Sequence, residues 1–159
     1  MSMEHDKITP YNADREKKEQ VAEMFDNIAN RYDLLNSILS LGIHKGWRKK
    51  CVKLLADKNP KNILDVATGT ADFAIACVPL NPDKITGIDI SEGMMAFGRE
   101  KIKKLQLNHL IVLEQGNAEN VTYPDNSFDA IIVGFGVRNF QNLNKGLANL
   151  YRMLKPGGQ

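Results

Sequence analysis

The stretch NILDVATGTADFA at residues 62–74 constrains the fold more than any other part of this chain. It begins with a short apolar run that ends near an acidic residue, crosses a turn of small residues and continues with apolar residues at helical spacing. This pattern predicts a buried strand, a tight turn and a helix. In open α/β sheets such a hinge lies at the carboxyl end of the strands, where nucleotide-like ligands bind. The stretch therefore predicts an α/β domain and locates its candidate ligand site.

Downstream of this stretch, strand and helix patterns continue to alternate. We expect strands at residues 63–67, 84–90, 109–114 and 128–135, and helices at 70–78, after Ser91 and after Asn142, each of which can cap a helix. Four such alternations predict a parallel, Rossmann-like sheet with right-handed crossovers. The chain then stops at a turn that normally leads into another strand. A sheet ending there exposes the edge of its fourth strand, so we expect either a longer protein, which we favour, or a partner on that edge.

The first 58 residues lie outside this alternating pattern. Residues 1–14 are polar and aperiodic, and we interpret them as a flexible arm. Val21, Phe25, Ile28 and Tyr32 step by four, three and four, which predicts one face of a helix. Two further apolar segments, separated at Gly42, extend the helical pattern through residue 58. We expect residues 15–58 to form a helical cap over the ligand edge of a core spanning residues 59–159.

Composition restricts the class of protein. At 159 residues the chain fits one domain, and a net charge of +2 with interleaved acids argues against a nucleic-acid partner. Cys51 and Cys77 are isolated, so we expect free, mostly buried thiols in a reducing cytoplasm. The charged N-terminus does not resemble a signal peptide, and the apolar run at residues 130–137 is too short to span a bilayer. No residue spacing indicates a metal site.

The turn argues against a dinucleotide. A glycine-rich template would place Gly-x-Gly-x-Gly after Asp65, but the three slots hold Ala67, Gly69 and Ala71, and GxGxxG is not met. Fewer glycines suit a ligand without a pyrophosphate. Asp89 follows the turn by about 20 residues, the spacing at which a carboxylate reaches ribose hydroxyls. The alternative interpretation of residues 65–71 is an ordinary strand–helix turn. For Asp89 it is an aspartate at the N-terminus of a helix, where the helix dipole favours a negative charge.

Three other segments are candidates for the site. Asn117 and Ala118, with Glu119, follow the third strand and can hydrogen-bond an adenine edge. The loop GFGVRNF at residues 134–140 contains Arg138 and follows the fourth strand. Tyr32 and His44 lie in the helical segments, and His44 can accept a proton near neutral pH, although a lone histidine is more often structural.

Together these segments resemble one family. Residues 65–72 resemble motif I of class I S-adenosylmethionine-dependent methyltransferases, and the chain as a whole resembles the ubiquinone/menaquinone biosynthesis C-methyltransferases. The matching segments are residues 25–33, 39–48, 87–91, 117–119, 135–139 and 152–158. Motif I is widely shared, whereas the segments at 32–33, 44–48 and 137–139 are more specific. Ala71 departs from the family's usual glycine, and the family continues with further strands beyond residue 158.

The resemblance implies a class I methyltransferase fold that transfers a methyl group from S-adenosylmethionine to a ring carbon of a polyprenylated quinol. It implies cofactor contacts at Thr70, Asp89, Asn117 and Ala118, with Asp65 and Gly69 shaping the methionine end. For catalysis we expect Arg138 to stabilise the phenolate and His44 or Tyr32 to accept the phenolic proton.

The same resemblance implies a cytoplasmic enzyme that contacts the membrane surface, because a prenyl tail is long and apolar. A homo-oligomer through the fourth strand is a further expectation. The alternatives are a fragment that binds cofactor without turnover, or a dinucleotide-dependent reductase. The sequence does not choose between a benzoquinol and a naphthoquinol.

Overall fold

The computed structural model describes residues 16–39 and 43–159, with side chains described for residues 16–29 and 46–159. The expected N-terminal arm lies outside these ranges. The helices are α1 (Lys17–Leu39), α2 (Ile43–Ala56), α3 (Asp72–Ala76), α4 (Glu92–Lys104) and α5 (Leu143–Met153), with short 3-10 helices η2 (Val78–Leu80) and η3 (Gly136–Asn139). The strands are β1 (Asn62–Val66), β2 (Lys84–Asp89), β3 (Ile111–Gln115) and β4 (Ala130–Val133).

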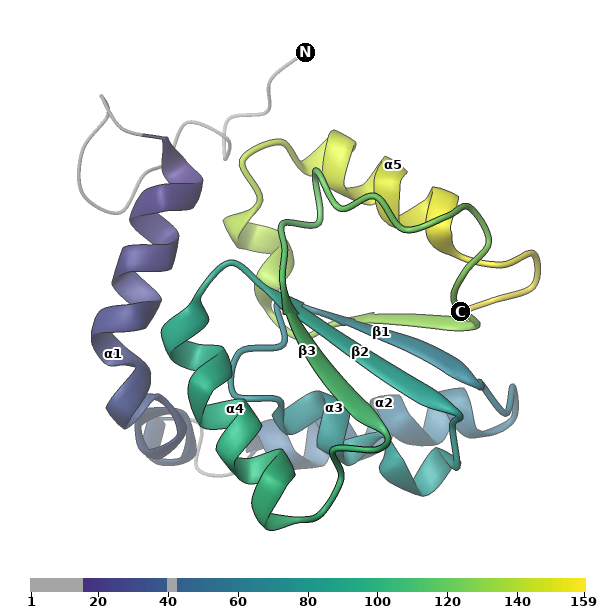
Figure 1. Ribbon diagram of the computed structural model, residues 1–159, viewed down its shortest axis with the longest axis horizontal. Helices are drawn as coiled ribbons and strands as arrows, with labels where there is room; N and C mark the ends of the chain where they lie inside the picture. The colour runs from purple at the N-terminus through teal and green to yellow at the C-terminus, as the bar shows by residue number, and fades with distance from the viewer. Residues whose placement is uncertain (1–15, 40–42) are drawn as a thin grey trace.

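The four strands form one parallel sheet in the order β3-β2-β1-β4, so the expected α/β class is confirmed. The outer edge of β4 is less open than its sequence suggests. Phe128 forms a parallel bridge with Leu154, and the Ile131 N–H donates to the Gln159 carbonyl at 2.8 Å. The last residues of the chain therefore turn back along the beginning of this edge (Figure 1).

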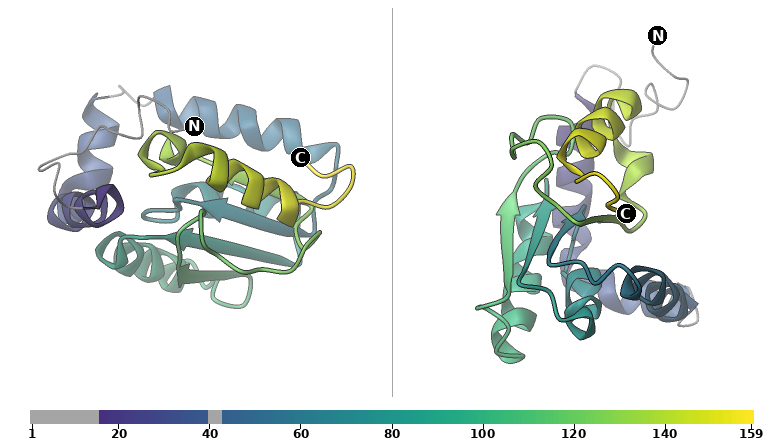
Figure 2. Two further views of the ribbon diagram at one scale, coloured as in Figure 1. Left: turned by 90° about the horizontal axis from the view of Figure 1, so that it is seen from above. Right: turned by 90° about the vertical axis from the view of Figure 1, so that its right-hand side faces the viewer.

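Helices cover both faces of the sheet (Figures 1 and 2). The alternation along β1 shows why: Ile63 contributes to the core beneath α2, α3 and α4, whereas Leu64 and Val66 contribute to the core beneath α5. Successive side chains of a strand point to opposite faces, so a strand that is apolar at every position needs cover on both. The right-hand view of Figure 2 shows α5 on one side of the strands and α2 on the other.

Two helices, rather than three, precede the sheet in the described residues. Residues 17–39 form one continuous helix because the apolar positions after Tyr32 continue without a break, and the predicted interruption at Gly42 lies outside the described residues. α1 packs against α4 and η3, at the carboxyl ends of the strands. α2 instead packs against α3 and η2, below the sheet, so only α1 of these two helices covers the ligand edge.

The two cysteines differ from expectation. Cys77 is buried, and its burial raises the thiol pKa to about 12, which keeps it protonated and unreactive. Cys51 is exposed, contrary to prediction: α2 packs through Arg48, Val52 and Leu55, and Cys51 lies at the border of that face. Within the described part of the chain, no helix is both long and apolar enough to cross a membrane.

Candidate ligand and active site

The turn between β1 and α3 keeps a glycine-type backbone although two of its three template slots are alanines. Ala67, Gly69 and Ala71 have φ of 56°, 55° and 63°. The left-handed region costs a residue with a Cβ about 1 kcal/mol or more, so the two alanines hold strained backbone that the surrounding structure maintains. Gly98 of α4 makes room for Ala71, because a Cβ on Gly98 would lie 3.1 Å from the Ala71 methyl group.

Asp65 holds this turn from below. Its Oδ2 accepts hydrogen bonds from the Thr68 hydroxyl at 2.7 Å and from the Ala74 N–H at 3.0 Å. The carboxyl is buried, and burial raises its pKa to about 7 despite these hydrogen bonds. Asp65 does not line the pocket described below, so the contact that it makes is with the turn itself.

Asp89 ends β2 and lies directly above the turn. Its Oδ2 accepts from the Gly69 N–H at 2.7 Å, and its Oδ1 accepts from the Ser91 N–H at 2.9 Å. Burial raises its pKa, which the backbone hydrogen bonds partly offset. A carboxylate has about four acceptor positions, so each oxygen keeps capacity for one hydroxyl of a ligand. Asp89 thus both fixes the position of Gly69 and presents a paired acceptor to the pocket.

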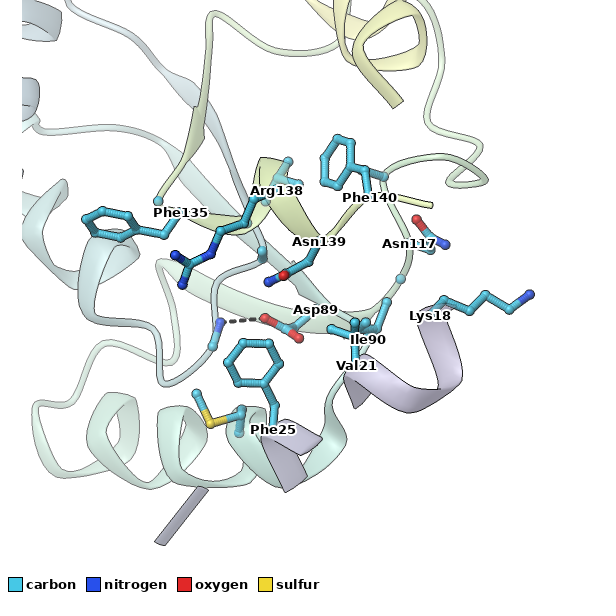
Figure 3. A pocket seen from close by; sticks show the side chains of 18 of the residues that line it. Lys18, Val21, Phe25, Asp89, Ile90, Asn117, Phe135, Arg138, Asn139 and Phe140 are labelled. Atoms are coloured by element: carbon cyan, nitrogen blue, oxygen red, sulfur yellow. Dashed lines mark hydrogen bonds between the residues drawn. The ribbon is translucent and has the colours of Figure 1, made fainter. Parts of the chain in front are cut away.

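A pocket opens at the carboxyl ends of the strands and brings together much of the predicted site. Its lining includes the predicted residues Gly69, Asp89, Asn117, Ala118 and Arg138. Figure 3 shows Arg138 and Phe135 toward one end, Asn117 and Lys18 toward the other, and Asp89 between them. The pocket is therefore elongated along the strand ends, with a carboxylate near its middle.

Of three further residues predicted for the site, the structure places one outside the pocket lining and does not describe the side chains of the other two. The Thr70 hydroxyl is buried and accepts a hydrogen bond from Lys101 Nζ at 2.9 Å, outside the pocket lining. Tyr32 and His44 lie on described helices, but their side chains are outside the described residues. The roles assigned to these residues, and to the five that line the pocket, stay predictions.

Helix α1 supplies a wall of the pocket, at the edge where the sequence predicted a helical cap but not which residues would line the site. Lys18, Val21 and Phe25 line the pocket, and in Figure 3 the Phe25 ring lies next to Asp89. The periodicity of Val21 and Phe25 predicted a buried helix face, but nothing local to α1 says what that face packs against. Met94 of α4 completes this side, with its methyl group close to Gly69.

Two polar contacts fasten α1 across the pocket. Asp26 Oδ1 accepts from the Ser91 hydroxyl at 2.5 Å and from the Gly93 N–H at 3.0 Å, at the beginning of α4. Lys17 Nζ donates to the Phe140 carbonyl at 3.2 Å, at the end of the Arg138 loop. The two contacts lie on opposite sides of Val21 along α1, so the pocket-lining part of the helix is held at both ends.

The loop that contains Arg138 has an unusual backbone at Phe135. This residue has φ of 66° and a ring that is 59% exposed. It is flanked by Gly134 and by Gly136, where a Cβ would lie only 2.3 Å from the Ala67 methyl group. The Phe135 ring lies beside the Trp47 indole of α2, with centroids 5.9 Å apart. The loop therefore approaches the β1–α3 turn closely and turns an aromatic ring outward.

Glu119 links two segments that form part of the pocket wall. The sequence predicted a ligand-binding role for residues 117–119 but no structural role for Glu119, whose carboxylate is buried and accepts from the backbone N–H groups of Gln141 and Asn142, at 2.7 and 3.0 Å. These bonds connect the segment after β3 to the beginning of α5. Among the side chains that the structure describes, no cluster of metal-ligating groups occurs.

The arrangement is that of class I methyltransferases. A solved structure titled as a [4+2]-cyclase, SpnF, superposes with a TM-score of 0.71 at 24% identity, covering 89% of this chain and 57% of that one. A SAM-dependent methyltransferase from Aquifex aeolicus matches with a TM-score of 0.55 at 28% identity, covering 60% of this chain and 52% of that one. The SpnF title shows that the fold alone does not specify methyl transfer.

Sequence comparison is more specific. Residues 13–159 match the model of the ubiE/COQ5 methyltransferase family, and the chain belongs to that family. A relative from Bacteroides fragilis named demethylmenaquinone methyltransferase is 52% identical over 99% of this chain and 65% of its own length. The chain thus spans about two thirds of the length of this curated relative.

Proposed function

We propose that this chain binds S-adenosylmethionine and, within the full-length protein, methylates a ring carbon of a polyprenylated quinol, in the way that the names of its relatives indicate. The observation that carries the proposal is the pocket itself. Four groups lie along the ends of the strands. They are Gly69, which lets a ligand approach the backbone closely, the Asp89 carboxylate, which can accept two hydrogen bonds, the loop that contains Asn117, and Arg138. Family membership makes methyl transfer the first chemistry to test in this pocket.

The residues present fit an adenosyl ligand. The free acceptor positions of Asp89 suit the two adjacent hydroxyls of a ribose, since one carboxylate accepts two hydrogen bonds side by side. Asn117 and Ala118 lie at one end of the pocket and offer hydrogen-bonding groups for a base. Gly69 leaves space for the methionine part near the β1–α3 turn, and we retain Thr70 and Asp65 as residues that shape this end through the turn.

A pyrophosphate fits this turn poorly. α3 has only five residues, so its dipole at the turn is small, and its first residue is Asp72. Asp72 is itself paired with Arg48 and Lys101, so the case against a pyrophosphate rests on the short helix and on the alanines at two of the three glycine slots of the turn. A ligand without phosphates does not need these features. The dinucleotide-dependent reductase is therefore the weaker of the two functions.

The Phe135 end of the pocket provides the substrate chemistry. S-adenosylmethionine supplies an electrophilic methyl group when bound. A phenolic hydroxyl has a pKa of about 10, and Arg138 can stabilise the phenolate that makes the neighbouring ring carbon electron-rich. α1 excludes water and limits the motion of the bound molecules. We assign proton removal to His44 or Tyr32.

Calorimetry with S-adenosylhomocysteine, S-adenosylmethionine and NAD tests the cofactor. We expect both adenosyl ligands to bind and NAD not to bind; the reverse pattern would establish the reductase instead. Activity is then measured in the chain extended to the full length of its relatives, with demethylmenaquinol and a demethylated benzoquinol offered separately. Normal turnover in an Arg138→Ala variant of that protein would remove Arg138 from the mechanism.

A further inference from the structure

Helix α2 concentrates positive charge. Its sequence, IHKGWRKKCVKLLA, contains five lysines and arginines and no acidic residue, whereas the whole chain has a net charge of only +2. The rest of the chain is therefore net negative. A strongly basic helix on an otherwise acidic chain indicates a surface with a specific anionic partner.

The two sides of α2 have different roles. Arg48, Val52 and Leu55 recur at spacings of four and three and form the inner side. Leu55 is buried, and Arg48 forms an ion pair with Asp72 of α3, with 3.1 Å between nitrogen and oxygen. These contacts fix the helix to the domain. Its outer side is left for another partner.

The outer side combines lysines with apolar residues. Lys49, Lys50 and Lys53 are exposed. Next to them, Trp47 and Leu54 are 56% and 63% exposed, seven residues apart and so on one stripe of the helix. A stripe with tryptophan and leucine beside a lysine-rich side is typical of helices that lie in the interface of a lipid bilayer. A nucleic acid would use the lysines but would leave the apolar stripe without a partner.

This outer side is continuous with the pocket. The Trp47 indole lies beside the Phe135 ring, which itself lines the pocket. Both rings are more than half exposed, so they form an apolar connection between the helix surface and the Arg138 end of the pocket. The exposed apolar stripe of α2 is therefore adjacent to the Arg138 end of the pocket.

We propose that the outer side of α2 docks on an anionic phospholipid bilayer and turns the Phe135 end of the pocket toward the lipid. The lysines attract the negative headgroups, and Trp47 and Leu54 enter the headgroup region. The orientation rests on the proposed function, because a polyprenylated quinol resides in the bilayer. The docking surface rests on α2 alone, and the two are tested separately.

Sedimentation with vesicles tests the surface. We expect the protein to bind phosphatidylglycerol/phosphatidylcholine vesicles and to bind pure phosphatidylcholine far more weakly, with affinity falling as salt increases. The variant Lys49→Gln/Lys50→Gln/Lys53→Gln should bind the anionic vesicles on the order of a hundredfold more weakly. The matched control, Lys84→Gln/Lys103→Gln/Lys104→Gln, removes the same charge from exposed sites elsewhere and should lose less than tenfold.

A second pair of variants tests the apolar stripe. Trp47→Ser/Leu54→Ser should weaken vesicle binding at least tenfold, whereas Leu147→Ser/Tyr151→Ser, on the exposed side of α5, should leave it unchanged. Circular dichroism and S-adenosylhomocysteine binding check that each variant is folded. Equal vesicle binding by the α2 lysine variant and its control would overturn the proposal, as would wild-type protein that binds duplex DNA or RNA but not anionic vesicles.

The outcomes for surface and function are distinguishable. Vesicle binding without S-adenosylhomocysteine binding would leave the docking surface in place and remove the proposed cofactor. The opposite result would keep the cofactor and remove the docking surface. If both bind, the α2 lysine variant should keep its affinity for S-adenosylhomocysteine, because none of its three positions lines the pocket.

Discussion

Two regions of the pocket are built in different ways. The region at Gly69 and Asp89 lies over the sheet: Asp89 and the underlying Asp65 are 8% and 1% exposed, and both carboxylates accept hydrogen bonds from backbone N–H groups. The Arg138 end consists of a loop with strained backbone, an outward-facing Phe135 and a neighbouring helix with its own exposed aromatic ring. Under the proposed function, the first region would hold the cofactor and the second the substrate.

α1 connects these regions, since Asp26 contacts the beginning of α4 and Lys17 contacts the end of the Arg138 loop. We therefore expect substitutions at buried Asp89 and Asp65 to change ligand affinity and protein stability strongly. Substitutions in α1 should change mainly the rate at which the pocket opens, and substitutions at strained but accessible positions should have small effects.

The largest expected effect follows from Asp89→Ala. This change removes the paired acceptor and the hydrogen bond that holds Gly69, so affinity for S-adenosylhomocysteine should fall on the order of a thousandfold. Isothermal titration calorimetry measures it, with exposed Asp83→Ala on the same segment as the unaffected control. A loss of less than tenfold would mean that Asp89 does not contact the ribose.

The second prediction concerns the pH dependence of stability at Asp65. Its pKa is raised to about 7 in the folded protein, above the ordinary value near 4 of the unfolded chain. Between these values the folded state binds a proton that the unfolded state has lost, so the contribution of Asp65 to stability falls as pH rises from about 4 to about 7. Between pH 5 and pH 8 the loss should be about 2 kcal/mol.

Urea unfolding at these two pH values, with Asp65→Asn as the comparison, isolates this contribution. The asparagine oxygen can still accept from Thr68 and Ala74 but does not titrate, so the variant should lose less stability than the wild-type protein over the same range. Identical pH profiles for the two proteins would show that Asp65 is ionised throughout.

A smaller change is expected for Asp26→Ala. Without its contacts to Ser91 and Gly93, α1 should open more often, and bound S-adenosylhomocysteine should dissociate about tenfold faster in stopped-flow displacement. Asp26→Asn keeps an acceptor oxygen and should restore most of the slow rate. Exposed Asn27→Ala is the control on the same helix. Equal rates in Asp26→Ala and the wild-type protein would show that α1 does not limit exchange.

The smallest expected effect is a gain in stability from Ala67→Gly. Glycine adopts φ of 56° without the steric cost of a Cβ, so the free energy of unfolding should rise by about 0.5–1 kcal/mol. Ala76→Gly, within α3, should lower it by about 1 kcal/mol. Chemical denaturation measures both, and the same sign for both variants would contradict the assigned strain at Ala67.

Sequence reasoning predicted the sheet and the edge at which the site lies, because strand periodicity and turn chemistry are local signals. It also selected Gly69, Asp89, Asn117, Ala118 and Arg138, which line one pocket, since the carboxyl ends of parallel strands lie together. The strand boundaries differ from the predicted ones by one or two residues at most ends, as the β4 limits of Ala130–Val133 show.

What the sequence could not predict depends on distant contacts. Asp26 meets Ser91 across 65 positions of the chain, and no local pattern reports such a contact. An alanine at position 67 or 71 gives no sign of its left-handed backbone, because that geometry is imposed by the structure around the turn. The packing of α2 below the sheet, which leaves Cys51 exposed, likewise depends on α3 and not on the periodicity of α2.

The strand order β3-β2-β1-β4 has a consequence for how this protein folds. β1 and β2 pair residues 22 positions apart (Asn62 with Lys84), and β2 and β3 pair residues 26 apart (Ile85 with Ile111), whereas Ile63 of β1 pairs with Ala130 of β4, 67 positions away. Closing that longer loop costs more chain entropy, so β1, β2 and β3 should associate first and β4 last. The Arg138 loop follows β4, so we expect the Arg138 end of the pocket to form after β1, β2 and β3 have associated.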